Sequence, residues 1–234
     1  MNKEKKIFFL STDTFHHRYI IKFFEQNNFF FQKYIFETSH VKPKFKISPF
    51  FEKETFQFEK KMFFKKFSYK INESKIFKTK NINSVNFEKY LNNEKPDIGI
   101  VFGTRKINKK IISKFKHGLI NVHRGIINKY RGLDSELWAI YHNDLKNIGV
   151  AIHKIDENLD TGSVIEQKKI QISTNIKIYQ LRYYTTVLAA KMLLKTIKKF
   201  YKSPKFTKTN IKNTGRYYSF MPLTLKKTLL KKFN

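Results

Sequence analysis

The sequence predicts an α/β fold: a Rossmann-like, mostly parallel sheet with helices on both faces, followed by a short basic tail. Two observations carry this prediction. Short apolar runs typical of buried strands alternate along the chain with amphipathic segments of helical period. Seven of the eight glycines lie between Gly99 and Gly162, where tight turns would join strands to loops. With 234 residues, of which 41% are hydrophobic, the chain can bury one core.

The first half of the chain is expected to supply three strands and three helices. The polar residues Ser11–Thr14 follow a short apolar run and can cap the next helix. Between residues 41 and 70, Phe and Lys are interleaved without a clear period. We interpret this stretch as a helix that packs its Phe side chains and exposes its Lys, although a platform for single-stranded nucleic acid has the same composition. The expected strands are Lys6–Leu10, Phe29–Glu37 and Ser74–Thr79, and the expected helices are Phe15–Gln26, one within 41–70, and Val85–Glu94.

From Pro96 onward the strand and helix signals are stronger. The run PDIGIVFG ends in a glycine, and LINVH is a second apolar run soon after it. Residues 1–200 would form one domain, and the basic residues 201–234 an extension that covers it or contacts a partner. The expected strands are 96–103, Leu119–His123, 147–156 and 162–172, and the expected helices are Ile107–Phe115, Ser135–His142 and Asn175–Lys199.

The composition excludes several kinds of site and of protein. The chain contains no Cys, which excludes disulfides and thiolate chemistry and suits a reducing cytosol. No apolar run reaches the roughly 20 residues that a membrane span needs, and the N-terminus has no signal-peptide pattern. We therefore expect a cytoplasmic protein without a membrane span.

The formal net charge of +30 has two interpretations. It favours a polyanionic partner such as nucleic acid. It also fits a general compositional bias, because nearly all of the 48 basic residues are Lys, whereas dedicated phosphate and base readers favour Arg. One asymmetry supports a functional charge: no acidic residue follows Glu166, whereas 17 Lys and Arg residues do. We expect that part of the chain to attract anionic substrates.

Asn121 and His123 are the strongest candidates for chemistry. They stand two residues apart at the end of an apolar strand, so both side chains point to one face at the edge where open α/β sheets bind ligands. An Asn can donate an N–H to a developing oxyanion, and a His can exchange a proton near neutral pH. A histidine at a strand end can also have a purely structural role.

A carboxylate would orient the imidazole of His123. Asp160, in the turn between two later strands, is the best candidate, and Asp156, Glu157 and Asp134 are alternatives on spacing alone. The turn Ser11–Thr14 offers free N–H groups that could hold an anion, but it lacks the glycines of a nucleotide fingerprint.

His16 and His17 are adjacent and cannot share one face of a helix, which argues against a metal pair. We expect a surface or capping role for both. No metal site is predicted anywhere in the chain.

The stretch around Asn121 resembles the catalytic core of the folate-dependent formyltransferases. This superfamily includes glycinamide ribonucleotide formyltransferase, methionyl-tRNA formyltransferase and the sugar-nucleotide N-formyltransferases. Its hallmark resembles an Asn-x-His pair, a loop ending in Tyr-Arg-Gly and a Leu-Asp-Thr-Gly turn. Asn121, His123, residues 130–132 and residues 159–162 match that pattern in order and spacing. The resemblance covers residues 96–170 and implies the formyltransferase fold, with residues 1–200 as the catalytic domain.

The resemblance implies that Asn121, His123 and Asp160 are catalytic and that N10-formyltetrahydrofolate is the formyl donor. The strand and loop written PDIGIVFGTRKI are similar to those that hold the folate pterin in the family. By that similarity, the donor-binding residues would be Phe102, Gly103, Thr104, Arg105, Ile107 and Asp156.

The acceptor implied by the resemblance is a primary amine on a small phosphorylated molecule, with a nucleotide-linked amino sugar as the first choice. Methionyl-tRNA and glycinamide ribonucleotide are the alternatives, and a module that binds folate or nucleic acid without catalysis is an alternative of another class. The methionyl-tRNA enzymes carry a further C-terminal barrel, for which residues 201–234 are too few. The expected acceptor-binding residues are Ser11, Thr12, Arg124 and Tyr130.

The chain departs from the family pattern in the loop after His123. Two positions that usually hold proline hold Arg124 and Asn128 here, so the loop should be less rigid. Arg124 either contacts a substrate phosphate or faces solvent. The tail motif RYYSFMP either covers the mouth of the site or makes a homodimer contact.

Overall fold

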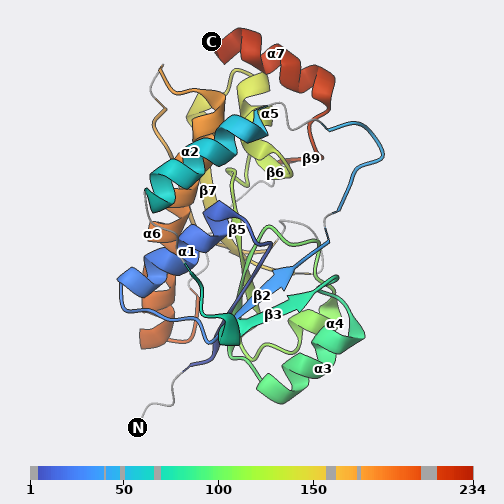
Figure 1. Cartoon of the computed structure of the whole chain (residues 1–234), viewed down its shortest axis with the longest axis vertical. Helices are drawn as coiled ribbons and strands as arrows, with labels where there is room; N and C mark the ends of the chain where they lie inside the picture. The colour runs from blue at the N-terminus through green and yellow to red at the C-terminus, as the bar shows by residue number, and fades with distance from the viewer. Residues whose placement is uncertain are drawn as a thin grey trace.

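A sheet of seven strands runs through the middle of the molecule (Figure 1). The computed structural model describes residues 5–39, 41–47, 51–65, 70–156, 162–172, 175–206 and 215–233. The strand order is β3-β2-β1-β4-β5-β7-β8; neighbours from β3 to β5 are parallel, and β7 is antiparallel to both β5 and β8. The bounds are Ile7–Ser11 (β1), Lys33–Glu37 (β2), Ile76–Thr79 (β3), Ile98–Phe102 (β4), Leu119–His123 (β5), Gly149–Lys154 (β7) and Val164–Lys169 (β8).

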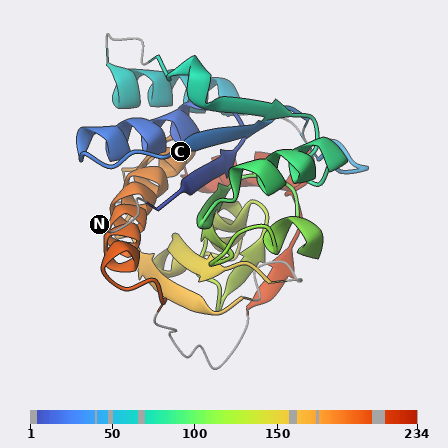
Figure 2. The ribbon, with the colours of Figure 1, turned by 90° about the horizontal axis from the view of Figure 1, so that it is seen from below.

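Helices cover both faces of this sheet (Figure 2). Helices α1 and α6 pack on one face, α3 and α4 pack on the other, and α2 lies against α1 and α6. This arrangement confirms the predicted fold class. The bounds are Phe15–Gln26 (α1), Glu52–Phe64 (α2), Val85–Glu94 (α3), Lys109–Ile112 (α4), Ser135–Tyr141 (α5), Leu181–Lys202 (α6) and Leu223–Phe233 (α7).

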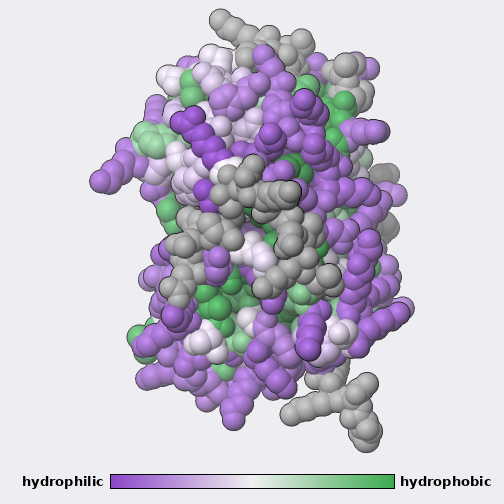
Figure 3. All heavy atoms as spheres, turned by 180° about the vertical axis from the view of Figure 1, so that it is seen from behind, coloured by the Kyte–Doolittle hydropathy of each residue, from purple (hydrophilic) through white to green (hydrophobic). Residues whose placement is uncertain are grey.

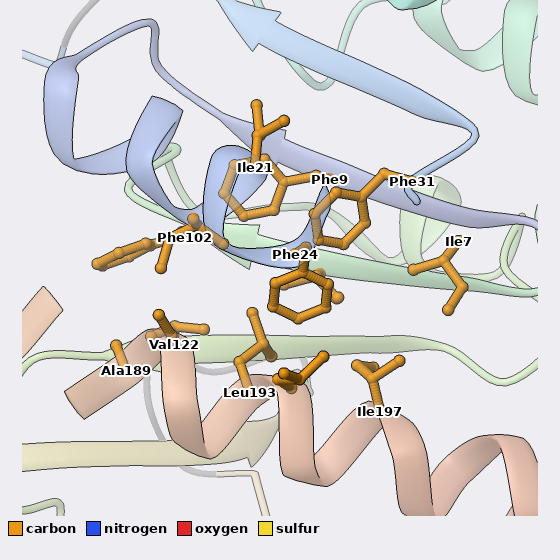
Figure 4. Close-up of a cluster of buried hydrophobic side chains, with 14 of the residues drawn as sticks. Ile7, Phe9, Ile21, Phe24, Phe31, Phe102, Val122, Ala189, Leu193 and Ile197 are labelled. Carbon is orange, nitrogen blue, oxygen red and sulfur yellow. The ribbon is translucent and has the colours of Figure 1, made fainter. Parts of the chain in front are cut away.

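Alternate residues of the central strands enter two different cores, because successive strand side chains point to opposite faces. On β1, Ile7 and Phe9 lie in the core beneath α1 and α6, whereas Phe8 and Leu10 lie in the core beneath α3 and α4. Figure 4 shows the first core, where aromatic rings from β1 and α1 gather above aliphatic side chains of α6. Burial of these side chains is the main force that holds the layers together.

Three elements have the bounds that the sequence predicts: the helices Phe15–Gln26 and Val85–Glu94, and the strand Leu119–His123. Helix α3 begins where Ser84 accepts a hydrogen bond from the N–H of Phe87, as expected for an N-cap serine. Local signals were sufficient for these elements.

Other elements are shorter than predicted or are displaced. The stretch 41–70 contains a helix, but α2 covers only Glu52–Phe64. The helix predicted at Ile107–Phe115 is the short α4, because the side chain of Asn108 caps it and Ile107 is buried in the core. The helix predicted from Asn175 begins at Leu181, after a 3-10 turn, and runs on to Lys202.

A second, two-stranded sheet joins segments that are far apart in the sequence. Strand β6 (Tyr130–Gly132) pairs in parallel with β9 (Arg216–Tyr218). Helix α7 follows β9 and lies beside α5, at the top of Figure 1. Part of the basic stretch 201–234 therefore packs on the residues that follow His123.

The surface seen from behind in Figure 3 is mostly hydrophilic, with smaller apolar areas between the polar side chains. This fits a chain with 28% charged residues. None of the described helices combines the length and apolarity that crossing a lipid bilayer requires.

Candidate active site

Asn121 and His123 lie at the carboxyl end of β5, on the same face of the sheet. The residues of β5 that alternate with them, Ile120 and Val122, point to the opposite face and enter the core beneath α1 and α6. The structure thus brings together the two residues that the spacing predicted to share a face. Both belong to the edge at which the parallel strands end, where ligands bind in α/β sheets.

The side chain of Asn121 is oriented by His153 of β7, a residue that the sequence did not indicate. The Nδ2 of Asn121 is 3.0 Å from Nε2 of His153, and Nδ1 of His153 is 2.8 Å from the Lys154 carbonyl. A carbonyl can only accept, so Nδ1 of His153 carries the proton and Nε2 accepts from the Asn121 amide. His153 is 2% exposed and pairs directly with Asn121 across the antiparallel strands. Only this strand pairing could have identified it.

The imidazole of His123 is held by the backbone of its own loop. Its Nε2 donates to the carbonyl of Tyr130 over 2.9 Å, and the hydroxyl of Ser135 is 3.4 Å from the same nitrogen. Because Nε2 carries this proton, Nδ1 is the nitrogen that can gain or lose a proton while the bond is kept. A Cβ on Gly125 would overlap Nε2 of His123, so only glycine fits there.

The loop after β4, predicted to bind the donor, begins at Gly103, whose φ of +77° favours glycine. A Cβ at Gly103 would lie 2.9 Å from the His17 ring. The Phe102 side chain is buried in the core beneath α1 and α6, and Ile107 in the core beneath α3 and α4. Thr104 Oγ1 donates to the neighbouring Arg105 carbonyl. The side chains of Phe102 and Ile107 are therefore not available to a ligand, to which the loop could offer only other groups, including its backbone.

Arg105 anchors the loop to the end of β2. Its Nε donates to Oε1 of Glu37 over 2.5 Å, and its backbone N–H donates to Oε2 over 3.0 Å. Glu37 is 2% exposed and also accepts from the backbone N–H of Ile82. The guanidinium further donates to the hydroxyl of Ser39. The Arg105 side chain is thus engaged with protein groups that hold the loop in place.

Two of the predicted acceptor-binding residues, Ser11 and Thr12, are buried. Thr12 Oγ1 is 3.1 Å from Nδ1 of His17. The hydroxyl of Ser11 has no hydrogen-bond partner among the described residues. These two residues lie at the carboxyl end of β1, next to the first turn of α1.

Arg124 and Tyr130 both follow His123 in the sequence but contact different neighbours. The Arg124 guanidinium is 5.9 Å from the centre of the Phe102 ring and 3.9 Å from Glu136. Its Nη1 is buried and has no hydrogen-bond partner among the described residues. The Tyr130 hydroxyl donates to Asp144 over 3.0 Å, and burial together with this bond raises the pKa of Tyr130.

The predicted third catalytic residue, Asp160, lies outside the described residues, as does the alternative Glu157. Asp156 is exposed at the end of the described segment before them. Asp134 is engaged elsewhere: its carboxylate accepts from the backbone N–H of Met221 over 2.9 Å and lies 3.5 Å from Nζ of Lys226.

Of the surface or capping role predicted for His16 and His17, the surface position is wrong, because both residues are buried, at 6% and 2% exposure. The ring centres are 4.1 Å apart, and Nδ1 of His17 donates to the Thr12 carbonyl over 2.7 Å. Helix α2 covers the pair and places Glu59 within 3.7 Å of His16. The sequence could not show this, because the covering helix comes from a distant stretch.

Burial lowers the pKa of His16 well below 6.5, and Arg182 and Arg124 lower it further. Burial, and next the neighbouring His16, lower the pKa of His17. Both rings are therefore neutral at pH 7, and the contact of His16 with Glu59 is not an ion pair.

This pair predicts a pH-dependent stability. The unfolded chain binds protons at these histidines near pH 6.5, whereas the native chain binds them only at lower pH. The contribution of the two neutral histidines to the free energy of unfolding is therefore fully present above pH 6.5. It is lost as the pH falls from there towards the lowered native pKa values, by about 1.4 kcal/mol per pH unit for each histidine. Urea unfolding at pH 7.5 and 5.5 measures this. His16→Gln/His17→Gln should flatten the dependence, and an unchanged slope in that variant would contradict it.

The model of the formyl transferase family matches residues 24–197 of the chain. Among curated proteins, a methionyl-tRNA formyltransferase of Thermodesulfovibrio yellowstonii is 37% identical over 118 residues. That match covers 50% of this chain and 38% of the relative, so the chain matches well under half of the relative's length.

Solved structures with the same fold come from sugar N-formyltransferases. One from a Shewanella species has a TM-score of 0.65 at 13% identity, and the match covers 92% of this chain and 77% of that one. A formyltransferase of Anoxybacillus kamchatkensis, solved with UDP-4,6-dideoxy-4-formamido-L-AltNAc and tetrahydrofolate, has a TM-score of 0.58 at 20% identity. That match covers 97% of this chain and 90% of that one.

Proposed function

Because the chain belongs to the formyl transferase family, we propose that it transfers a formyl group from N10-formyltetrahydrofolate to a primary amine. The observation that carries this proposal is the pair Asn121 and His123, which lies at the ligand-binding edge of the sheet with both side chains oriented by hydrogen bonds. Packing alone would not require two neighbouring polar side chains that are each held in one orientation by a hydrogen bond.

In the proposed reaction, the acceptor amine attacks the formyl carbon, a new C–N bond forms and the bond to the donor nitrogen breaks. Asn121 donates an amide N–H to the formyl oxygen as it gains negative charge. His123, through Nδ1, carries the proton that the amine loses towards the leaving nitrogen. Asp160 would orient His123, a role that stays a prediction.

The donor would bind against the loop from Gly103 to Ile107. The polar edge of a pterin needs backbone N–H and C=O groups, and this loop has irregular backbone outside any helix or strand. Glycine at position 103 lets the chain turn close to His17, and the contacts between Arg105 and Glu37 hold the loop before the donor arrives. The donor site is thus largely preformed.

For the acceptor, we propose a nucleotide-linked amino sugar. The Anoxybacillus protein, which was solved with a nucleotide-linked formamido sugar, is matched over 90% of its length. Arg124 supports a phosphorylated acceptor, since its side chain directly follows His123 and is 28% exposed, although Nη1 lies 3.9 Å from the Glu136 carboxylate.

Formyl transfer assayed with N10-formyltetrahydrofolate and a panel of acceptors tests the proposal. The panel holds UDP- and dTDP-linked amino sugars, glycinamide ribonucleotide and methionyl-tRNA. Transfer to an amino sugar nucleotide, and to no other acceptor, is the expected result. Folate binding without transfer to any acceptor would favour a binding module and contradict the enzyme.

The second candidate acceptor is methionyl-tRNA, which the lysines of α6 favour. Five exposed lysines line a hollow on the surface of this helix: Lys191, Lys195, Lys198, Lys199 and Lys202. A polyanion that neutralises several of them would bind with a steep dependence on salt concentration, whereas a sugar nucleotide would show a shallow one. Binding titrations between low and physiological salt separate the two acceptors.

We expect His153→Leu to lower kcat by about 10-fold, because the Asn121 amide loses the acceptor that orients it. KM for the donor should change little, since the loop after β4 is untouched. His153→Gln should restore most of the rate, because its amide oxygen can accept the same hydrogen bond. Equal loss in both variants would show that packing, and not the hydrogen bond, matters at this position.

A further inference from the structure

The C-terminal strand β9 lies directly on the loop that follows His123. It pairs in parallel with β6, in the register Tyr130 with Arg216 and Gly132 with Tyr218. Two further backbone hydrogen bonds flank the pairing: Gly215 N–H donates to Ile127 and Leu133 N–H donates to Tyr218, both over 2.9 Å. Hydrogen bonds thus connect the two segments from one end of the strand pair to the other.

Side chains on both sides of the strand pair reinforce it. The Tyr218 ring lies 5.0 Å from Trp138 and 5.6 Å from Tyr130, measured between ring centres. The indole N–H of Trp138 donates to the carbonyl of Ser219 over 2.9 Å. Met221, just beyond the strand, is fully buried. These contacts bind residues 215–221 to the loop and to helix α5.

Two glycines allow the backbones to meet. A Cβ at Gly132 would overlap the carbonyl of Tyr218, and a Cβ at Gly215 would overlap the backbone of Lys129. Gly132 also has a φ of +90°, whereas Gly215 needs no special backbone angle. Any side chain at either position would push the two strands apart.

The strand pair holds the carbonyl that orients His123. Tyr130, the first residue of β6, accepts the hydrogen bond from Nε2 of His123. The loop between them, residues 124–129, contains no proline that would stiffen it. A strand of three residues cannot hold its own geometry without a partner.

We propose that β9 is a positioning element for the reaction: through β6 it fixes the Tyr130 carbonyl and so keeps His123 in one orientation, with the proton on Nε2. The strand does not touch the reacting atoms. The rate readout rests on the proposed formyl transfer, whereas the orientation of His123 can be measured without it.

Single added methyl groups test this in the full-length protein. Gly132→Ala should separate the strands from the side of β6, and Gly215→Ala should separate them from the side of β9. Gly118→Ala is the matched control, because Gly118 has a φ of +75° and a Cβ there would meet nothing within 4 Å. It imposes the same kind of backbone strain as Gly132→Ala without touching β9. Circular dichroism and thermal unfolding establish that each variant is folded.

Two readouts are recorded for each variant: kcat with KM, and the ¹⁵N NMR signals of the His123 ring, assigned by comparison with His123→Asn. In the wild type and in Gly118→Ala we expect one tautomer, protonated at Nε2. In Gly215→Ala and Gly132→Ala we expect a mixture of tautomers and a kcat lowered by about 10²-fold, as misplacement of a reacting group predicts. KM for the donor should stay near the wild-type value.

The outcomes separate the two proposals. A single Nε2 tautomer in Gly215→Ala and Gly132→Ala overturns the positioning role, even if the rate falls. Suppose that neither the wild type nor any variant transfers a formyl group, but Gly215→Ala and Gly132→Ala still show a mixture of tautomers. That result supports the positioning role and contradicts the proposed function. Equal effects in Gly118→Ala would attribute the result to general strain and overturn the proposal.

Discussion

Replacing His123 by Asn should lower the rate of formyl transfer by about 10³-fold. An asparagine cannot exchange a proton near neutral pH, and its shorter side chain also gives up the hydrogen bond that Nε2 of His123 donates to the Tyr130 carbonyl. KM for N10-formyltetrahydrofolate should stay close to the wild-type value. Steady-state kinetics with the best acceptor from the panel measures both constants.

The matched control is His117→Asn, just before the other end of the same strand. The His117 ring packs against Phe200, with 5.2 Å between ring centres, and has no part in the proposed reaction. The His117→Asn enzyme should transfer the formyl group at the wild-type rate. A His123→Asn enzyme that kept the wild-type rate would remove His123 from the proposed mechanism.

Replacing Glu59 by Ala should lower the free energy of unfolding by about 3 kcal/mol, at the lower end of the range for breaking a buried ion pair. Glu59 is 1% exposed and accepts two hydrogen bonds from Arg182, over 2.6 and 3.0 Å. Its removal leaves the Arg182 guanidinium without this partner at the junction of α2 and α6. The lower end of that range applies because the Arg182 side chain is 26% exposed. Urea unfolding at pH 7.5 measures the change.

Glu54→Ala provides the comparison, because Glu54 is an exposed residue of the same helix. It should change stability by less than about 0.5 kcal/mol, as surface substitutions usually do. If both variants lost the same amount of stability, helix propensity or charge, and not the buried ion pair, would be the cause.

The parts of the fold that the sequence predicted correctly depend on neighbours along the chain. Helix Phe15–Gln26 follows polar residues and has an apolar stripe, and strand Leu119–His123 is an apolar run between a glycine and a loop. The pair Asn121 and His123 could be placed on one face because side chains in a strand alternate.

What the sequence did not show depends on segments that are distant along the chain. A surface position was one of the two roles expected for His16 and His17, and helix α2 buries them. The Arg105 guanidinium is engaged by Glu37 from another strand, and a donor-binding role for this residue stays a prediction. His153 gave no signal of its own, since its role arises from the pairing of β7 with β5.

The sequence alone determined the alternation of strands and helices, the resemblance to the formyltransferases and the shared face of Asn121 and His123. Periodicity and short motifs encode these features within a few residues of each other. Only the tertiary structure decided that His153 orients Asn121, that Glu59 lies buried with Arg182, and that β9 packs on the loop after His123. Each of these depends on which strands pair and which helices pack together, and periodicity does not specify such contacts between distant residues.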